Sequence, residues 1–142
     1  MTVRPTLLAR LLATLAAFVL AVVGTAGTST AVVTADKVSA TSPNGLAYGE
    51  AFIEFQSEGF VRWNSIYLND RCPGDGVRAS MKLYIRQYGN VVHVGTREDV
   101  GGCESGPFTG SAYWSSGGPI DYAGIRVCSD GGCSPIKWVM RP

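Results

Sequence analysis

Apolar and polar residues alternate along most of the chain after residue 46. From residue 47 to 56 every second position is small or apolar, and the same pattern returns with its clearest register from residue 79 to 88. A repeat of two residues is the spacing of side chains on one face of a strand, so both segments are predicted to be strands with one buried face. The outward positions of the second strand include Tyr84, Arg86 and Tyr88.

Two more segments are predicted to be strands. Residues 60–69 are rich in aromatic and β-branched side chains, which favour strands, and residues 108–114 form a short strand between two loops. The pattern does not decide which face of the 60–69 strand is the core face, because each face carries an apolar set. Both faces are therefore candidates for burial. One set is Val61, Trp63 and Tyr67, and the other is Phe60, Ile66 and Leu68.

A two-residue turn at Gly89-Asn90 is predicted to join the 79–88 strand to a partner strand over residues 91–97. This register would place Ile85 opposite Val94 on the core face. On the outer face it would place Arg86 opposite His93.

The segment from residue 125 to 140 predicts a disulfide-clamped hairpin. Asp130-Gly131 is typical of a two-residue turn in which both central residues need a positive φ. That turn puts Cys128 opposite Cys133 at a pair of positions close enough for a disulfide. The same register, continued outward, puts Ala123 opposite Trp138 on the core face.

If the chain is exported, its four cysteines indicate two disulfides, for which three connectivities exist. The predicted hairpin over residues 79–97 brings Cys72 and Cys103 together at its open end. Other pairings would separate the tight Cys128 and Cys133 pair. We therefore predict bridges between Cys72 and Cys103 and between Cys128 and Cys133.

These elements predict an all-β fold, a single antiparallel β-sandwich of about seven strands. The sandwich is expected to span residues 47–142, after a polar N-terminal segment at 36–46. No helical stretch or internal repeat follows residue 46, and an immunoglobulin-like layout fits this strand count.

The first 35 residues read as a signal peptide that is removed on export. Arg4 and Arg10 precede an apolar run that is too short to span a membrane, and small residues follow it. Ala31 and Ala35 both end a small-x-small cleavage pattern, and Ala35 is the preferred site. The mature protein is therefore predicted to be secreted and extracellular, with no membrane association after cleavage.

Charge and motifs exclude several function classes. The 12 basic residues nearly balance the 11 acidic ones, which does not favour a nucleic-acid partner. The single histidine, His93, is predicted to be a surface strand residue, because no triad, zinc-protease or paired Cys/His spacing accompanies it. No catalytic residue, metal ligand or cofactor is predicted.

Acidic side chains gather in the two loops that a Cys72–Cys103 bridge would join. Calcium binding there is predicted to be absent or weak, because arginines are interleaved with the acids and no calcium-loop spacing occurs. A small hydrolase that uses these carboxylates is the alternative from another function class. The acids are Asp70, Asp75, Glu98, Asp99 and Glu104.

The leading hypothesis is a non-catalytic extracellular binding module for an unknown protein or polymer. Tyrosine and arginine on an exposed strand are residue types that favour binding, so Tyr84, Arg86 and Tyr88 are the candidate binding surface. Any exposed tryptophan among Trp63, Trp114 and Trp138 would add to it, although large aromatic residues are mostly buried.

The signal peptide, the mature length, the two local disulfides and the C-terminal Cys-x4-Cys hairpin together resemble small exported β-sandwich proteins of actinobacteria. The hairpin from Cys128 to Cys133 is also similar to a loop of the neocarzinostatin-like chromoproteins, whose sandwich holds an enediyne in a cleft. That similarity covers about a dozen residues, and the other disulfide departs from that family because it would close a long loop. The resemblance supports export and a sandwich. A secreted hydrolase inhibitor or a structural protein of the envelope also fits this class.

Overall fold

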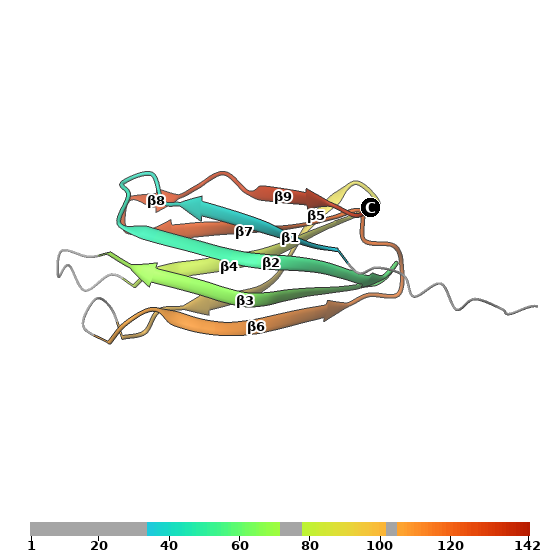
Figure 1. Ribbon diagram of the computed structural model, residues 1–142. Helices are drawn as coiled ribbons and strands as arrows, with labels where there is room; N and C mark the ends of the chain where they lie inside the picture. The colour runs from blue at the N-terminus through green and yellow to red at the C-terminus, as the bar shows by residue number, and fades with distance from the viewer. Residues whose placement is uncertain (1–33, 72–77, 102–104) are drawn as a thin grey trace, which may run out of the picture. The chain divides into compact units, whose positions relative to one another are not determined.

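The computed structural model describes residues 34–71, 78–101 and 105–142, which form two antiparallel β-sheets (Figure 1). One sheet has the order β1-β2-β3-β6, and the other has the order β5-β4-β7, with β8 and β9 following each other along the free edge of β7. The described residues contain no helix, which confirms the all-β sandwich. The strands are β1 (Ala35–Thr41), β2 (Ala47–Ser57), β3 (Phe60–Asp70), β4 (Ser80–Gln87), β5 (Asn90–Glu98), β6 (Phe108–Ser115), β7 (Tyr122–Ser129), β8 (Gly132–Cys133) and β9 (Lys137–Met140).

The strand count exceeds the predicted seven for two reasons. The segment 36–46, predicted to be a polar lead-in, contains most of β1, which pairs with β2 along its whole length. Only Val38 and Ala40 of β1 are buried. The alternation of apolar and polar residues in this segment is therefore too short to predict a strand from the sequence. In addition, the second half of the last hairpin is divided into β8 and β9.

The core combines small residues of β2 with large residues of the facing sheet. Gly49 is buried, and a Cβ atom there would lie 2.5 Å from Cε of Met81 and 3.0 Å from a methyl group of Val127. The alternation predicted for β2 and β4 is confirmed, since the apolar sets of both strands face this core. The absence of a side chain at Gly49 therefore leaves room for Met81 and Val127 between the sheets.

A bulge in β3 explains why two apolar sets competed in that segment. Ser65 has φ 47°, and the pairing with both neighbouring strands shifts by one residue around it. An extra residue reverses the alternation, so Trp63 before the bulge and Ile66 after it face the same core. The core face of β3 therefore takes Val61 and Trp63 from one of the two apolar sets and Ile66 and Leu68 from the other.

The turn between β4 and β5 is Tyr88-Gly89, and the prediction of Gly89-Asn90 is wrong by one residue. Tyr88 and Gly89 have φ 51° and 77°, and Gln87 pairs with Asn90. This turn type needs a positive φ at both central positions, and glycine here takes the second one. Arg86 therefore pairs with Val91, and His93 pairs with Tyr84. The predicted pairs of Arg86 with His93 and Ile85 with Val94 are not formed.

The C-terminal hairpin confirms the predicted pairing and the Cys128–Cys133 disulfide, whose Cα atoms lie 4.0 Å apart. The predicted turn type is wrong, because neither Asp130 nor Gly131 has a positive φ, and Gly132 after them has φ 98°. Beyond the disulfide the register changes, and Gly124, not Ala123, lies opposite Trp138. The Val127 N–H donates to the Ser134 hydroxyl at 3.1 Å, so a side chain takes the place of a backbone acceptor. One extra residue enters between β8 and β9 next to Pro135, and it moves Trp138 from the core face to the outer face.

Several predictions fall outside the described residues. The signal peptide lies almost wholly in residues 1–33, and the predicted Cys72–Cys103 bridge lies in residues 72–77 and 102–104, together with Asp75 and Glu104. These assignments stay predictions. Within the described part of the chain, no helix has the length and apolar character that a membrane span requires.

Candidate binding face

The outer face of the sheet formed by β5, β4, β7 and β9 combines aromatic and basic side chains. Strand pairing places the residues in rows that cross the sheet. We call this surface the aromatic–cationic face. Its rows are His93, Tyr84, Gly124 and Trp138; Val91, Arg86, Tyr122 and Met140; and Thr96, Lys82 and Arg126.

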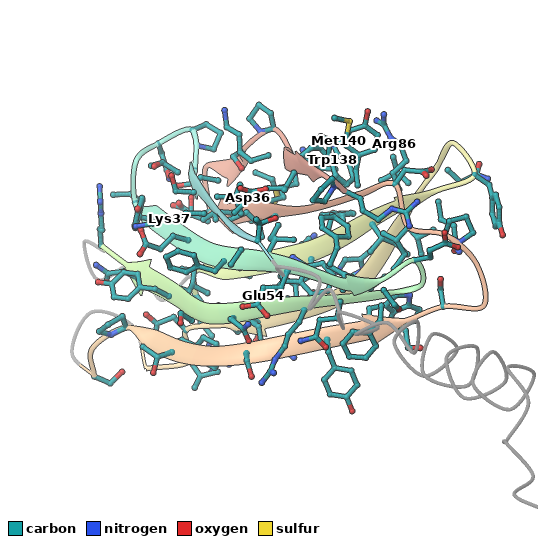
Figure 2. The ribbon with its side chains drawn as sticks, turned by 45° about the vertical axis from the view of Figure 1, so that its right-hand side comes forward. Asp36, Lys37, Glu54, Arg86, Trp138 and Met140 are labelled. Atoms are coloured by element: carbon teal, nitrogen blue, oxygen red, sulfur yellow. A yellow bond between two sulfur atoms is a disulfide. The ribbon has the colours of Figure 1, made fainter. Side chains whose placement is uncertain are left out.

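Arg86 lies on this face between two aromatic rings. Its guanidinium carbon is 5.3 Å from the ring centre of Tyr122 and 5.3 Å from that of Trp138. The two rings meet edge to face, with centres 6.4 Å apart. Figure 2 shows Arg86, Trp138 and Met140 gathered in one part of the sheet. Each cation–π contact contributes about 0.5 to 1 kcal/mol and fixes the guanidinium in place.

Among the described residues, no acidic group forms an ion pair with Arg86, and its buried Nε atom has no hydrogen-bond partner. An arginine held by rings keeps its charge without the neutralising carboxylate that such residues usually have. It therefore presents an uncompensated positive charge to the outer surface.

Gly124 makes room for Trp138 on this face. A Cβ atom at Gly124 would lie 2.8 Å from Cε3 of Trp138 and 2.5 Å from the Lys137 carbonyl oxygen. The missing side chain lets the indole lie against the sheet. In the same row, the rings of Tyr84 and His93 lie 5.2 Å apart.

The charge of the aromatic–cationic face is positive. Strand register places Lys82, Arg86 and Arg126 on it, and Glu98 at its far end is the one acidic residue on these described strands with an outward position. Arg126 is anchored, because its Nε atom donates to the Ser134 carbonyl oxygen at 2.6 Å. The surface therefore suits a ligand that carries negative charge.

The predicted binding residues divide between two places. Tyr84 and Arg86 are half-buried on the aromatic–cationic face, as their register predicts. Tyr88 is 70% exposed but lies in the turn, where its hydroxyl approaches Gly118. Tyr88 therefore does not continue the stripe of the other two residues.

The loop acids do not form an open carboxylate pair among the described residues. Asp70 and Asp99 are both buried and lie together. The Asp70 N–H donates to the Asp99 carboxylate at 3.2 Å, and the Ala79 N–H donates to the Asp70 carboxylate at 3.3 Å. These carboxylates hold strand ends together. In the described part of the chain, no three metal-binding side chains gather in one place.

The outer face of the other sheet has a mixed charge. A Glu50 carboxylate oxygen accepts a hydrogen bond from the Tyr48 hydroxyl at 2.6 Å and lies 2.9 Å from Nζ of Lys37. Both contacts, the tyrosine first, hold the pKa of Glu50 below its usual value. Lys37 here has an acidic partner, in contrast to Arg86.

Glu50 should therefore make the stability of the protein depend on pH. A carboxylate with a lowered folded-state pKa stabilises the fold above its unfolded pKa, and the contribution is lost as pH falls through the folded pKa. Unfolding of wild type and Glu50→Gln should differ in stability near pH 7 and converge below the ordinary glutamate value of 4.5. Tyr48→Phe removes the main donor and should move this convergence to higher pH. Parallel curves for wild type and Glu50→Gln over the whole pH range would contradict the assignment.

Comparison with protein-family models, curated proteins and solved structures finds no match to this chain. Function must therefore be argued from the residues and their geometry.

Sequence reasoning missed Tyr122 and Gly124 as members of the binding face, and it named Trp138 only as an addition in case it proved exposed. Tyr122 precedes the clear alternation of β7, and Trp138 was placed on the core face by the uninterrupted register. Pro135 next to Ser134 was the available signal, because a proline without an N–H often marks an interruption in strand pairing.

Proposed function

We propose that this chain is exported and acts outside the cell as a non-catalytic binding module for an acidic polysaccharide. The Cys128–Cys133 disulfide is compatible with an oxidising compartment, and the predicted signal peptide supports export. The aromatic–cationic face is the proposed binding surface.

The observation that carries the proposal is Arg86, which is fixed between Tyr122 and Trp138 and has no acidic partner among the described residues. A charged group that is already immobilised loses little conformational freedom when a ligand binds. Sugar rings can stack on flat aromatic side chains, while carboxylates of the same polymer meet Arg86 and its basic neighbours. A sheet surface of several rows suits a chain-like ligand better than a small molecule, which needs a concave pocket.

Asp70 and Asp99 do not support the alternative of a small hydrolase. Their carboxylates accept hydrogen bonds from backbone N–H groups and are buried, so they are poorly placed to reach a substrate. A general acid or base must reach the reacting group within hydrogen-bond distance.

Binding of polygalacturonate, which carries one carboxylate on each sugar, tests the proposal. Its methyl-esterified form has the same backbone without the charge. We expect calorimetry or affinity electrophoresis to detect the charged polymer only. Lys82→Gln and Tyr84→Ala should each weaken binding about tenfold, which corresponds to about 1.4 kcal/mol. Arg62→Gln, which removes the same charge from the other sheet, is the matched control and should bind like wild type.

Two results would reject this function. One is that the charged and esterified polymers bind equally well, or that neither of them binds. The other is weaker binding in Arg62→Gln while Lys82→Gln and Tyr84→Ala bind like wild type. Thermal unfolding of each variant verifies that the fold is retained.

A further inference from the structure

The free strand edges of the described structure are not equally protected. Exposed edges invite pairing with another chain, and proteins block them with charges, prolines or bulges. β1 carries Asp36 and Lys37 (Figure 2), and β9 follows Pro135 and begins with the exposed Lys137. β5 contains a bulge and charged residues at its end.

Of these protections, β6 has only a preceding proline, Pro107. Its eight residues, Phe108–Ser115, include no charged residue and no proline. It forms the edge of its sheet, along the bottom in Figure 1, and pairs only with β3. Tyr113 is 73% exposed and Trp114 is 36% exposed. The outer edge of β6 is therefore an open template for an added strand.

A groove lies on each side of this edge. The inner groove has a volume of about 600 Å³ between β5 and β6, where Val94 and Arg97 face Trp114. The outer groove has a volume of about 300 Å³ and is lined by Phe60, Arg62 and Tyr113, with Gln56 and Ser111. The side chains of an added strand alternate between two faces, so the grooves lie where successive side chains would point.

Arg97 gives the inner groove a charge preference. Its Nη1 atom donates to the Thr96 carbonyl at 2.9 Å, and no acidic side chain of the described residues forms an ion pair with it. Arg62 in the outer groove has Glu54 opposite it on β2, so its charge is partly balanced. The unbalanced charge beside β6 is thus Arg97.

We propose that β6 is a docking site for an extended acidic segment of another protein, which adds as a strand and places a carboxylate against Arg97. Backbone hydrogen bonds to β6 provide affinity, and Trp114 with Val94 contacts the apolar neighbours of the carboxylate. A second copy of this chain pairing through β6 does not meet the charge requirement, because β6 has no carboxylate. This site is separate from the aromatic–cationic face.

Eight-residue peptides of threonine and valine, blocked at both ends and carrying one glutamate at each position in turn, test the proposal on the mature protein. Glutamine counterparts are the neutral controls. Amide NMR and tryptophan fluorescence report binding. We expect at least one glutamate peptide to shift the amides of Phe108–Ser115 and to bind about tenfold more tightly than its glutamine counterpart. Arg97→Gln should abolish that preference.

Ser111 lines both grooves and is exposed, so it accepts substitutions without a change to the core. Ser111→Glu should repel the acidic peptide, whereas Ser111→Lys of similar length should retain it. Lys137→Gln removes a positive charge from the opposite edge and should leave the affinity unchanged.

Three outcomes would overturn the proposal. The first is that no peptide shifts the β6 amides at millimolar concentration. The second is equal affinity for the glutamate and glutamine peptides. The third is a concentration-dependent dimer that shifts the β6 amides without peptide, because this would assign the edge to a second copy. Polygalacturonate binding by the Arg97→Gln and Ser111→Glu variants should stay normal, so failure here is distinct from failure of the polysaccharide function.

Discussion

Replacing Trp63 by alanine is expected to lower the free energy of unfolding by about 3 to 5 kcal/mol. Trp63 is fully buried and is the largest side chain of the core. It lies on β3 just before the bulge and pairs with Ala112 of β6, so the small neighbour cannot fill the space left by the indole. Denaturant unfolding followed by circular dichroism measures the loss.

Trp63→Phe is the matched control for this prediction. The indole Nε1 of Trp63 is buried and has no hydrogen-bond partner in the described structure. A buried donor without a partner lowers the free energy of unfolding by about 1 to 3 kcal/mol. Removing this donor therefore offsets part of the stability that is lost with the packing of the indole. Trp63→Phe should therefore be much less destabilising than Trp63→Ala. Both variants lack Nε1, so equal losses would contradict the prediction, because the retained ring would then restore no packing.

Replacing Gly124 by valine is expected to disrupt both the β7–β9 pairing and the aromatic–cationic face. The added side chain would meet the Lys137 carbonyl oxygen and the Trp138 ring, and both must move. Overpacking of this kind costs about 1 to 3 kcal/mol. Because Trp138 also holds Arg86, the variant should lose polygalacturonate binding more completely than Lys82→Gln.

Gly117→Val serves as the control for the second prediction. Gly117 is exposed, and a Cβ atom there would meet nothing within 4 Å. This variant should retain wild-type stability and binding. If Gly124→Val also binds polygalacturonate like wild type, Trp138 does not belong to the binding surface.

The buried faces of β2 and β4 could be predicted from the sequence because their alternation is uninterrupted. Ile53 and Leu83 lie in the core as the repeat of two indicates. This repeat depends only on the geometry of a single strand, and burial of one face is enough to reveal it. The antiparallel sandwich followed from the same information.

Pairing register could not be predicted with the same success, because it depends on single inserted residues. Ser65 in β3 and the extra residue beside Pro135 each shift the partners by one position, and the Tyr88-Gly89 turn shifts them by two. The amino-acid sequence of one strand does not predict where its partner strand contains an extra residue. A shift of one position moves every later side chain to the other face. The uninterrupted register therefore placed Trp138 in the core, whereas the extra residue beside Pro135 places it on the outer face.

The candidate site was predicted in part for the same reason. Tyr84 and Arg86 belong to the strand with the clearest register, and they lie on the outer face. Their partners Tyr122 and Trp138 come from strands almost 40 and more than 50 residues later, and only the pairing of β4 with β7 and β9 with β7 joins them. Clusters that depend on several registers are the part of a site that local patterns do not reveal.

Amide NMR of the ¹⁵N-labelled protein, titrated with oligomers of polygalacturonate, tests the central claim most directly. We expect the largest shifts to map to the outer face of β4, β7 and β9, including Tyr84, Gly124 and Trp138, and methyl-esterified oligomers to cause none of them. Shifts centred on the β1-β2-β3-β6 sheet, or no shifts at millimolar oligomer, would contradict it.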